Sequence, residues 1–171
     1  MRTKLLIAAV FLVGAASVAY AAFSQILTVN GTGNVTGNWD VEIKTITRTD
    51  SNTGATNHLG VAPSVAPDGL TANFNVDLAF PGSSATYVIV YENKGNIPAK
   101  VTTLPDLTTT NAADPADVTY AVTGIALNDT IAPAATLTAT VTATWAGGAT
   151  ANVTTASKAV AVTYNFSQNT P

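Results

Sequence analysis

Catalytic chemistry in this chain would have to be built around His58, which is the only histidine, and there is no cysteine. A structural zinc site needs about four nitrogen, sulfur or carboxylate ligands, and a Ser/His/Asp triad needs a histidine as its base. The sequence contains neither His-Glu-x-x-His nor a Gly-x-Ser-x-Gly turn. His58 stands in the polar stretch 56–60, which favours an exposed loop residue. We therefore expect no catalytic residue, no metal site and no enzymatic activity.

Binding sites for phosphate or calcium are equally hard to assemble. The glycine-rich stretches 31–33 and 147–148 lack the third glycine and the lysine of phosphate-binding loops. Three loop aspartates could bind calcium weakly: Asp50, Asp114 and Asp117. Their spacing does not resemble a calcium-binding loop, and solvated turn residues are the favoured interpretation. No cofactor is expected.

Asparagine is the residue type for which the sequence predicts a modification. Five Asn-x-Ser/Thr sequences occur, and a glycan is tolerated where such a sequence lies on a surface turn. Four of them fall in or near predicted turns and are the candidate glycosylation sites: Asn30, Asn34, Asn128 and Asn152. The fifth, Asn165, falls in a predicted strand. In a chain this rich in threonine, some of these sequences arise by chance.

The composition predicts strands and an acidic surface. Threonine supplies 29 of the 171 residues, whereas glutamate occurs only twice, and β-branched side chains favour strands over helices. Seven Lys/Arg stand against ten Asp/Glu, a net charge of −3. This balance argues against a nucleic-acid partner and against anionic membrane surfaces, because both attract basic proteins.

Residues 1–21 have the pattern of a secretion signal peptide. Two basic residues open the chain, an apolar stretch follows, and 19–21 supply a small-x-small cleavage site before Ala22. One competing interpretation is a retained anchor, since the apolar run is about long enough to span a bilayer. Another is a type IV pilin leader, although its usual cut site is missing. Cleavage before Ala22 is favoured, which predicts a secreted protein that meets the membrane only through its transient signal peptide.

Alternation of apolar and polar residues predicts strands along the rest of the chain. It is regular over 71–78, 136–145 and 159–166, so one face of each strand would be apolar and the other polar. In 40–49 the apolar residues change face midway, which indicates a bulge or a two-sided environment. Residues 87–91 are apolar throughout, as in a central strand of a sandwich.

Two shorter candidate strands, 99–104 and 118–123, bring the total to roughly eight or nine. Turn sequences rich in glycine, proline, asparagine and aspartate separate the strands, and 105–117 is predicted to be a long loop. The spacing predicts an all-β fold, a two-sheet sandwich or jelly-roll-like arrangement, in a single domain over 31–171.

Residues 22–30 form a strand-forming segment directly after the cleavage site. Phe23, Leu27 and Val29 would share one face and Ile26 the other, and glycines follow as a flexible joint. The segment is either the first strand of its own domain or a donor strand that completes the sheet of a neighbouring copy. These residues alone leave both alternatives open.

Five stretches resemble one family of secreted proteins. The most specific combines Leu-Ala-Phe-Pro-Gly at 78–82 with Tyr-Glu-Asn-Lys-Gly-Asn-Ile-Pro-Ala-Lys-Val at 91–101, a Pro-Gly turn and an Asn-x-Gly turn around strands. The others are the Ala-Phe after the cut site, Val-Thr-Gly-Asn-Trp-Asp-Val at 35–41, Ile-Ala-Pro and the strand after it at 131–145, and Val-Thr-Tyr-Asn-Phe-Ser-Gln at 162–168. Together they resemble the TasA/camelysin group of secreted fibre-forming matrix proteins and the related subunits of archaeal bundling pili.

The resemblance implies a jelly-roll-like fold and polymerisation into extracellular fibres by donor-strand exchange. It favours the donor role for 22–30, with four apolar side chains filling pockets of the next copy: Phe23, Ile26, Leu27 and Val29. Its motifs are turns and strands, not catalytic residues. Camelysin-type proteins have been classed as metallopeptidases, a role for which this sequence supplies no set of metal ligands.

The sequence therefore predicts a secreted structural subunit of an extracellular filament, pilus or biofilm matrix fibre. Its expected partners are copies of itself in a head-to-tail homopolymer, and the threonine face of 136–145 would suit lateral bundling with neighbouring fibres. The alternative is a monomeric cell-surface adhesion or binding module, with 22–30 folded into its own sheet.

Overall fold

The protein is nearly all-β over the residues that the structure describes. The computed structural model describes residues 36–51, 54–149 and 158–169, and within them eleven strands form antiparallel sheets, with 44% strand and 6% helix. This confirms the all-β sandwich class expected from the sequence. The predicted signal peptide, 1–21, and the predicted donor strand, 22–30, lie outside the described residues.

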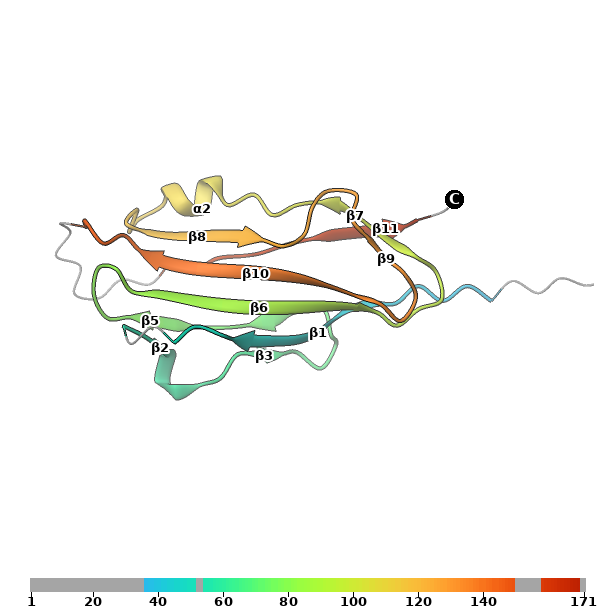
Figure 1. The fold of residues 1–171 in the computed structure, drawn as a ribbon, viewed down its shortest axis with the longest axis horizontal. Coiled ribbons are helices and arrows are strands. Elements are labelled where there is room, and N and C mark those ends of the chain that lie inside the picture. The colour runs from blue at the N-terminus through green and yellow to red at the C-terminus, as the bar shows by residue number, and fades with distance from the viewer. Residues whose placement is uncertain (1–35, 52–53, 150–157, 170–171) are drawn as a thin grey trace, which may run out of the picture. The chain divides into compact units, whose positions relative to one another are not determined.

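One layer of the sandwich is a continuous four-stranded antiparallel sheet, which we call the front sheet (Figure 1). Its strands, in spatial order, are β1 (Val41–Arg48), β6 (Ser84–Asn93), β10 (Thr136–Trp145) and β8 (Val118–Thr123). The bounds of β8 and β10 are those predicted from the sequence. The central position of β6, between β1 and β10, also confirms the prediction for its apolar run.

The front sheet buries one face and exposes the other. On β6 and β10 every second side chain points to the core, and Tyr87 and Val141 are fully buried. The opposite face carries the threonines of β10 together with Val88 and Val90 of β6, because directly paired residues share a face. The alternation predicted for 136–145 is therefore confirmed.

A β-bulge in β1 brings all of its apolar residues to the core. The pairing with β6 shifts between Ile43 and Thr45, so Lys44 is the extra residue. Without the shift, Ile43 and Ile46 would point to opposite faces, because the side-chain period of a strand is two. With it, both side chains contribute to the same hydrophobic core. Of the two alternatives that the sequence left open for 40–49, the bulge is confirmed.

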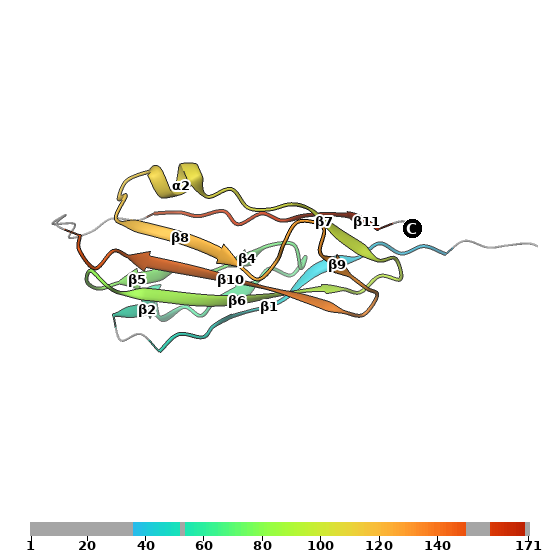
Figure 2. The same ribbon diagram turned by 45° about the horizontal axis from the view of Figure 1, so that its top comes forward.

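The second layer is divided among three small antiparallel sheets (Figure 2). Side chains from all three pack into the core that the front sheet covers. The sheets are β2 (Ala55–Asn57) with β5 (Val76–Leu78), β3 (Ser64–Val65) with β4 (Ala72–Asn73), and β11 (Asn165–Gln168), β7 (Ala99–Thr103) and β9 (Thr130–Ile131) in that order. No ladder joins these sheets to one another among the described residues.

Three details of the sequence prediction were wrong. The single strand predicted over 71–78 is two strands, because β4 pairs with β3 and β5 pairs with β2. The strand predicted over 159–166 begins only at Asn165, where pairing with β7 starts. The predicted loop 105–117 contains a short helix, α2 (Thr108–Ala112). No helix in the described part of the chain is long and apolar enough to cross a bilayer.

Hydrogen bonds hold the first described residues against the turn that follows β6. The side-chain amide of Asn96 donates to the carbonyl oxygen of Thr36 over 2.7 Å, and the N–H of Asn38 donates to Asn96 Oδ1 over 2.7 Å. The turn fits closely because Gly95 has no side chain. A Cβ on Gly95 would lie 2.3 Å from the carbonyl oxygen of Asn38.

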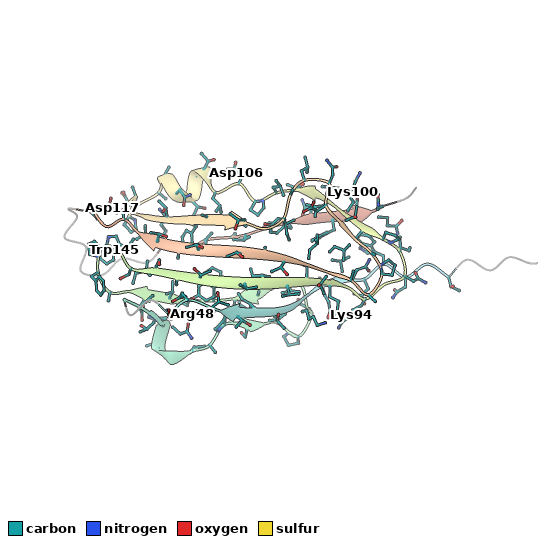
Figure 3. The ribbon with its side chains drawn as sticks, viewed as in Figure 1. Arg48, Lys94, Lys100, Asp106, Asp117 and Trp145 are labelled. Atoms are coloured by element: carbon teal, nitrogen blue, oxygen red, sulfur yellow. The ribbon has the colours of Figure 1, made fainter. Side chains whose placement is uncertain are left out.

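This turn defines one end of the sandwich, which we call the entry end. β11 finishes there too, since Gln168 pairs with Ala99 and the N–H of Asn169 donates to the carbonyl oxygen of Pro98. The other end, the far end, carries Asp117 and Trp145, and Figure 3 shows both of them at the end of the front sheet opposite to Lys94. The chain therefore enters, and its last described strand ends, at the same end.

Substitution of Gly95 by alanine tests this attachment. We expect Gly95→Ala to lower the free energy of unfolding by about 1–3 kcal/mol, because the new methyl group would push the turn away from the backbone of Asn38. Gly148→Ala is the matched control, since its Cβ would meet no atom within 4 Å. Urea unfolding of both variants would measure the difference. Equal stability of the two variants would show that residues 36–40 do not pack against the turn as described.

Candidate functional site

His58 is paired with one aspartate in the part of the chain that the structure describes. His58 lies in a short 3-10 turn, η1 (His58–Gly60), and its Nδ1 is 2.7 Å from Asp77 Oδ1. Both side chains are exposed, by 42% and 54%. In the described ranges, no group of three or more histidine, aspartate or glutamate side chains could hold a metal ion. The pair is therefore an exposed contact between η1 and β5.

Asp50 has a structural role and is not a solvated turn residue. Its carboxylate accepts two hydrogen bonds from Arg48, of 2.8 and 2.6 Å, and one from the N–H of Thr86, of 2.8 Å. The side chain is only 9% exposed. The interpretation of Asp50 as a solvated residue was therefore wrong, because its bonds join the end of β1 to β6.

One candidate glycosylation site lies in the described part of the chain. Asn128 is exposed in the turn before β9 and has a positive φ of 71°. Asparagine tolerates this left-handed conformation better than most residues. Its position confirms the turn expected there. The other candidate sites, Asn30, Asn34 and Asn152, lie outside the described residues.

Both outer edges of the front sheet are covered by other parts of the chain. On β8, the side chain of Asn111 in α2 accepts from the N–H of Tyr120 and donates to its carbonyl oxygen, as a neighbouring strand would. On β1, the N–H of Ile43 donates to the carbonyl oxygen of Gly69 over 2.7 Å. Such covering prevents an edge from pairing with another chain.

Residues 159–164 are an extended stretch without such cover among the described residues, and we call them the open segment. Val160, Val162 and Tyr164 are half-buried and alternate with exposed residues, as they would in a strand. Yet among the described residues no backbone hydrogen bond involves 159–164, and the ladder with β7 starts at Asn165. Buried backbone groups are nearly always hydrogen-bonded within folded proteins, whereas exposed ones can bond to water. Over the described residues, the open segment therefore has the side-chain pattern of a strand without the backbone partners of one.

The strands β4 and β5 also have an unpaired edge in the described part of the chain. β4 pairs only with β3, and β5 only with β2. The inward side chains of this stretch remain half-exposed, although they contact the core: Ala72, Phe74, Val76 and Leu78. By contrast, the inward residues of β6 are almost fully buried. The second layer is thus less completely covered than the front sheet.

Aromatic side chains attach both of these edges to β6. The ring centroid of Phe74 is 4.4 Å from that of Tyr87, and Tyr91 is 5.5 Å from Tyr164 and 5.6 Å from Phe166. Burial raises the pKa of Tyr91, and also that of Tyr164. Both phenols therefore stay protonated and uncharged at physiological pH. The side chains beside the open segment are apolar or neutral, which suits an apolar partner strand.

Lys158 fixes the start of the open segment at the far end. Four backbone carbonyl oxygens lie 2.6 to 3.1 Å from its ammonium nitrogen, so its three N–H donors are shared among them: those of Asn111, Ala113, Pro115 and Val118. Its own carbonyl oxygen accepts from the Tyr120 hydroxyl over 2.6 Å. Burial lowers the pKa of Lys158, with Asp114 opposing the shift, while the carbonyl oxygens favour the charged form.

Chemically, this site can bind an extended peptide. A strand added to the open segment could pair with N–H and C=O groups that have no partner among the described residues, and the half-exposed side chains would supply pockets. The predicted donor residues Phe23, Ile26, Leu27 and Val29 lie outside the described residues. Sequence reasoning missed the open segment as a site, because its alternation predicted an ordinary paired strand. The missing pairing depends on distant parts of the chain and leaves no local signal.

The role of Lys158 can be measured with a matched pair of lysine variants. We expect Lys158→Met to lower the free energy of unfolding by about 1–2 kcal/mol, because charge-assisted hydrogen bonds to four carbonyl groups are lost from a partly exposed site. Lys100→Met removes the same charge from a side chain with no hydrogen bond recorded among the described residues. Thermal unfolding of both would separate the bonds from the charge. A Lys100→Met loss as large as that of Lys158→Met would contradict this role.

Similarity to known proteins does not add to this geometry. The function must therefore be argued from the contacts of the chain itself. Comparisons with family models, with curated proteins and with solved structures find no match to this chain.

Proposed function

We propose that this protein is a secreted structural subunit of an extracellular filament that polymerises by strand donation. Residues 22–30 of one copy would pair with the second layer of the next. A head-to-tail contact of this kind does not close on itself and grows a filament. The leader 1–21 would direct export and would then be removed.

The open segment is the observation that carries this proposal. It is extended, half-buried on its inner side and without backbone partners in the described ranges. Gly69 and Asn111 bond to the outer edges of β1 and β8, so the chain protects both outer edges of the front sheet. A half-buried edge left open beneath this protected sheet is a site for strand addition.

The apolar character of 22–30 supports the same proposal. Phe23, Ile26, Leu27 and Val29 are large side chains for a segment at the beginning of a secreted domain. The described residues form a hydrophobic core among themselves. The alternative, a monomeric adhesion or binding module, would need 22–30 to complete its own sandwich.

Deletion of 22–30 distinguishes the two functions. In the chain expressed with its leader, we expect the deletion to abolish filaments and to leave a folded monomer, because the described residues form a hydrophobic core among themselves. Negative-stain electron microscopy would detect the filaments, and circular dichroism with thermal unfolding would report the fold. A variant that unfolds on deletion would favour the monomeric module.

Two charge substitutions within 22–30 provide a matched test that keeps the chain length. Leu27→Asp places a carboxylate on the face that would enter the next copy, at a cost of several kcal/mol when a charge is buried without a partner. Thr28→Asp adds the same charge to the opposite face. We expect the first to prevent polymerisation and the second to permit it. Filaments of equal yield from both would argue against donation by this segment.

A further inference from the structure

The described residues set the direction in which the chain leaves the sandwich. Residues 36–40 are fixed at the entry end by the turn around Asn96. The open segment runs the length of the second layer towards this end: it starts at Lys158, beside Val118 at the far end, and continues into β11 (Figure 1). Thr36, the first described residue, therefore lies at the end towards which the open segment runs.

We infer that residues 22–30 of one copy pair antiparallel with residues 159–166 of the next, an inference that rests on the proposed function. In a head-to-tail filament every copy has the same orientation, so the entry end of one meets the far end of the next. In the direction from Thr36 towards residue 22, the donor would leave the entry end of its own copy. It would then run along the neighbouring copy from the far end of that copy to its entry end. From residue 22 to residue 30 it therefore runs opposite to the open segment.

Insertion into the chain's own sandwich gives the reverse polarity. Residues 31–35 would have to reverse the direction of the chain at the entry end, and a segment of this length is sufficient for a reversal. From residue 22 to residue 30, the segment would then run from the far end to the entry end, parallel to its own open segment. The polarity of pairing thus separates a filament subunit from a monomer that completes itself.

The side chains of the two segments match in the antiparallel register. Residues directly opposite each other in an antiparallel pair share a face. A register that pairs Leu27 with Val162 also pairs Phe23 with Phe166, and Val29 with Val160. On the acceptor side all three residues are half-buried, and Val162 and Phe166 pack against the core cluster. All three apolar residues on the inner face of the donor therefore meet apolar partners.

The absence of cysteine from the chain allows a direct test of polarity. Ser24→Cys and Thr28→Cys, on the outer face of the donor, are each combined in the full-length chain with one cysteine at 159, 161, 163, 165 or 167. A disulfide forms readily only where the two Cα atoms are about 4.4–6.8 Å apart. Filaments are oxidised, and cross-linked ladders are measured on non-reducing gels.

Antiparallel pairing predicts that Ser24→Cys reacts best with Asn165→Cys and Thr28→Cys with Ala161→Cys. A shift of register would move the best-reacting acceptor position of both donor cysteines by the same number of residues. The best acceptor position for Thr28→Cys would still lie four residues nearer the N-terminus than that for Ser24→Cys. Parallel pairing places it four residues nearer the C-terminus, which would overturn the inference. A disulfide within a single chain, in place of a ladder, would overturn it as well.

The proposed function and this inference fail in different ways. Filaments that form normally, with no cross-link at any of the five acceptor positions, would remove residues 159–166 as the acceptor and leave the filament function standing. If the chain without added cysteines forms no filaments, both the function and the inference fall. Ser51→Cys in place of the acceptor cysteine is the control for random oxidation, because Ser51 is an exposed residue outside the second-layer strands.

Discussion

The constraint on which this structure depends is that backbone N–H and C=O groups at the edge of a strand need partners. β6 and β10 meet it by pairing on both sides. The outer edges of β8 and β1 meet it with the Asn111 side chain and the Gly69 carbonyl group. Residues 159–164 do not meet it within the described chain. The sandwich is therefore closed on one layer and incomplete on the other.

The front sheet is stabilised by contacts of its own as well as by packing against the second layer. Asn93, fully buried at the end of β6, donates to the carbonyl oxygens of Ile97 and Ile131 and accepts from the N–H of Gly95. At the other end of the sheet, Asp50 joins β1 to β6. The Asn93 and Asp50 side chains therefore have hydrogen-bond partners, and these bonds hold the strand ends of the front sheet in place.

Alternation in the sequence predicted the features that depend on neighbouring residues alone. The bounds of β8 and β10 and the bulge in β1 follow from alternation, which is a property of neighbouring residues. The division of 71–78 and the late start of β11 were not predictable in this way, since a strand exists only where a distant segment supplies hydrogen bonds. The hydrogen bonds between Asn111 and β8 were missed for the same reason. Asn111 lies in the predicted loop 105–117, and its partner Tyr120 lies outside that loop.

A strand acceptor binds well only if it is already ordered, because ordering a flexible chain on binding costs free energy. The open segment is held at its start by Lys158 and the Tyr120 hydroxyl, and at its end by the ladder between β11 and β7. Between these points, Tyr164 packs edge-on against Tyr91. The segment is thus fixed at both ends and in between by contacts within the described chain. If the proposed function holds, these contacts would lower the free-energy cost of binding a donor strand, because the acceptor would already be ordered.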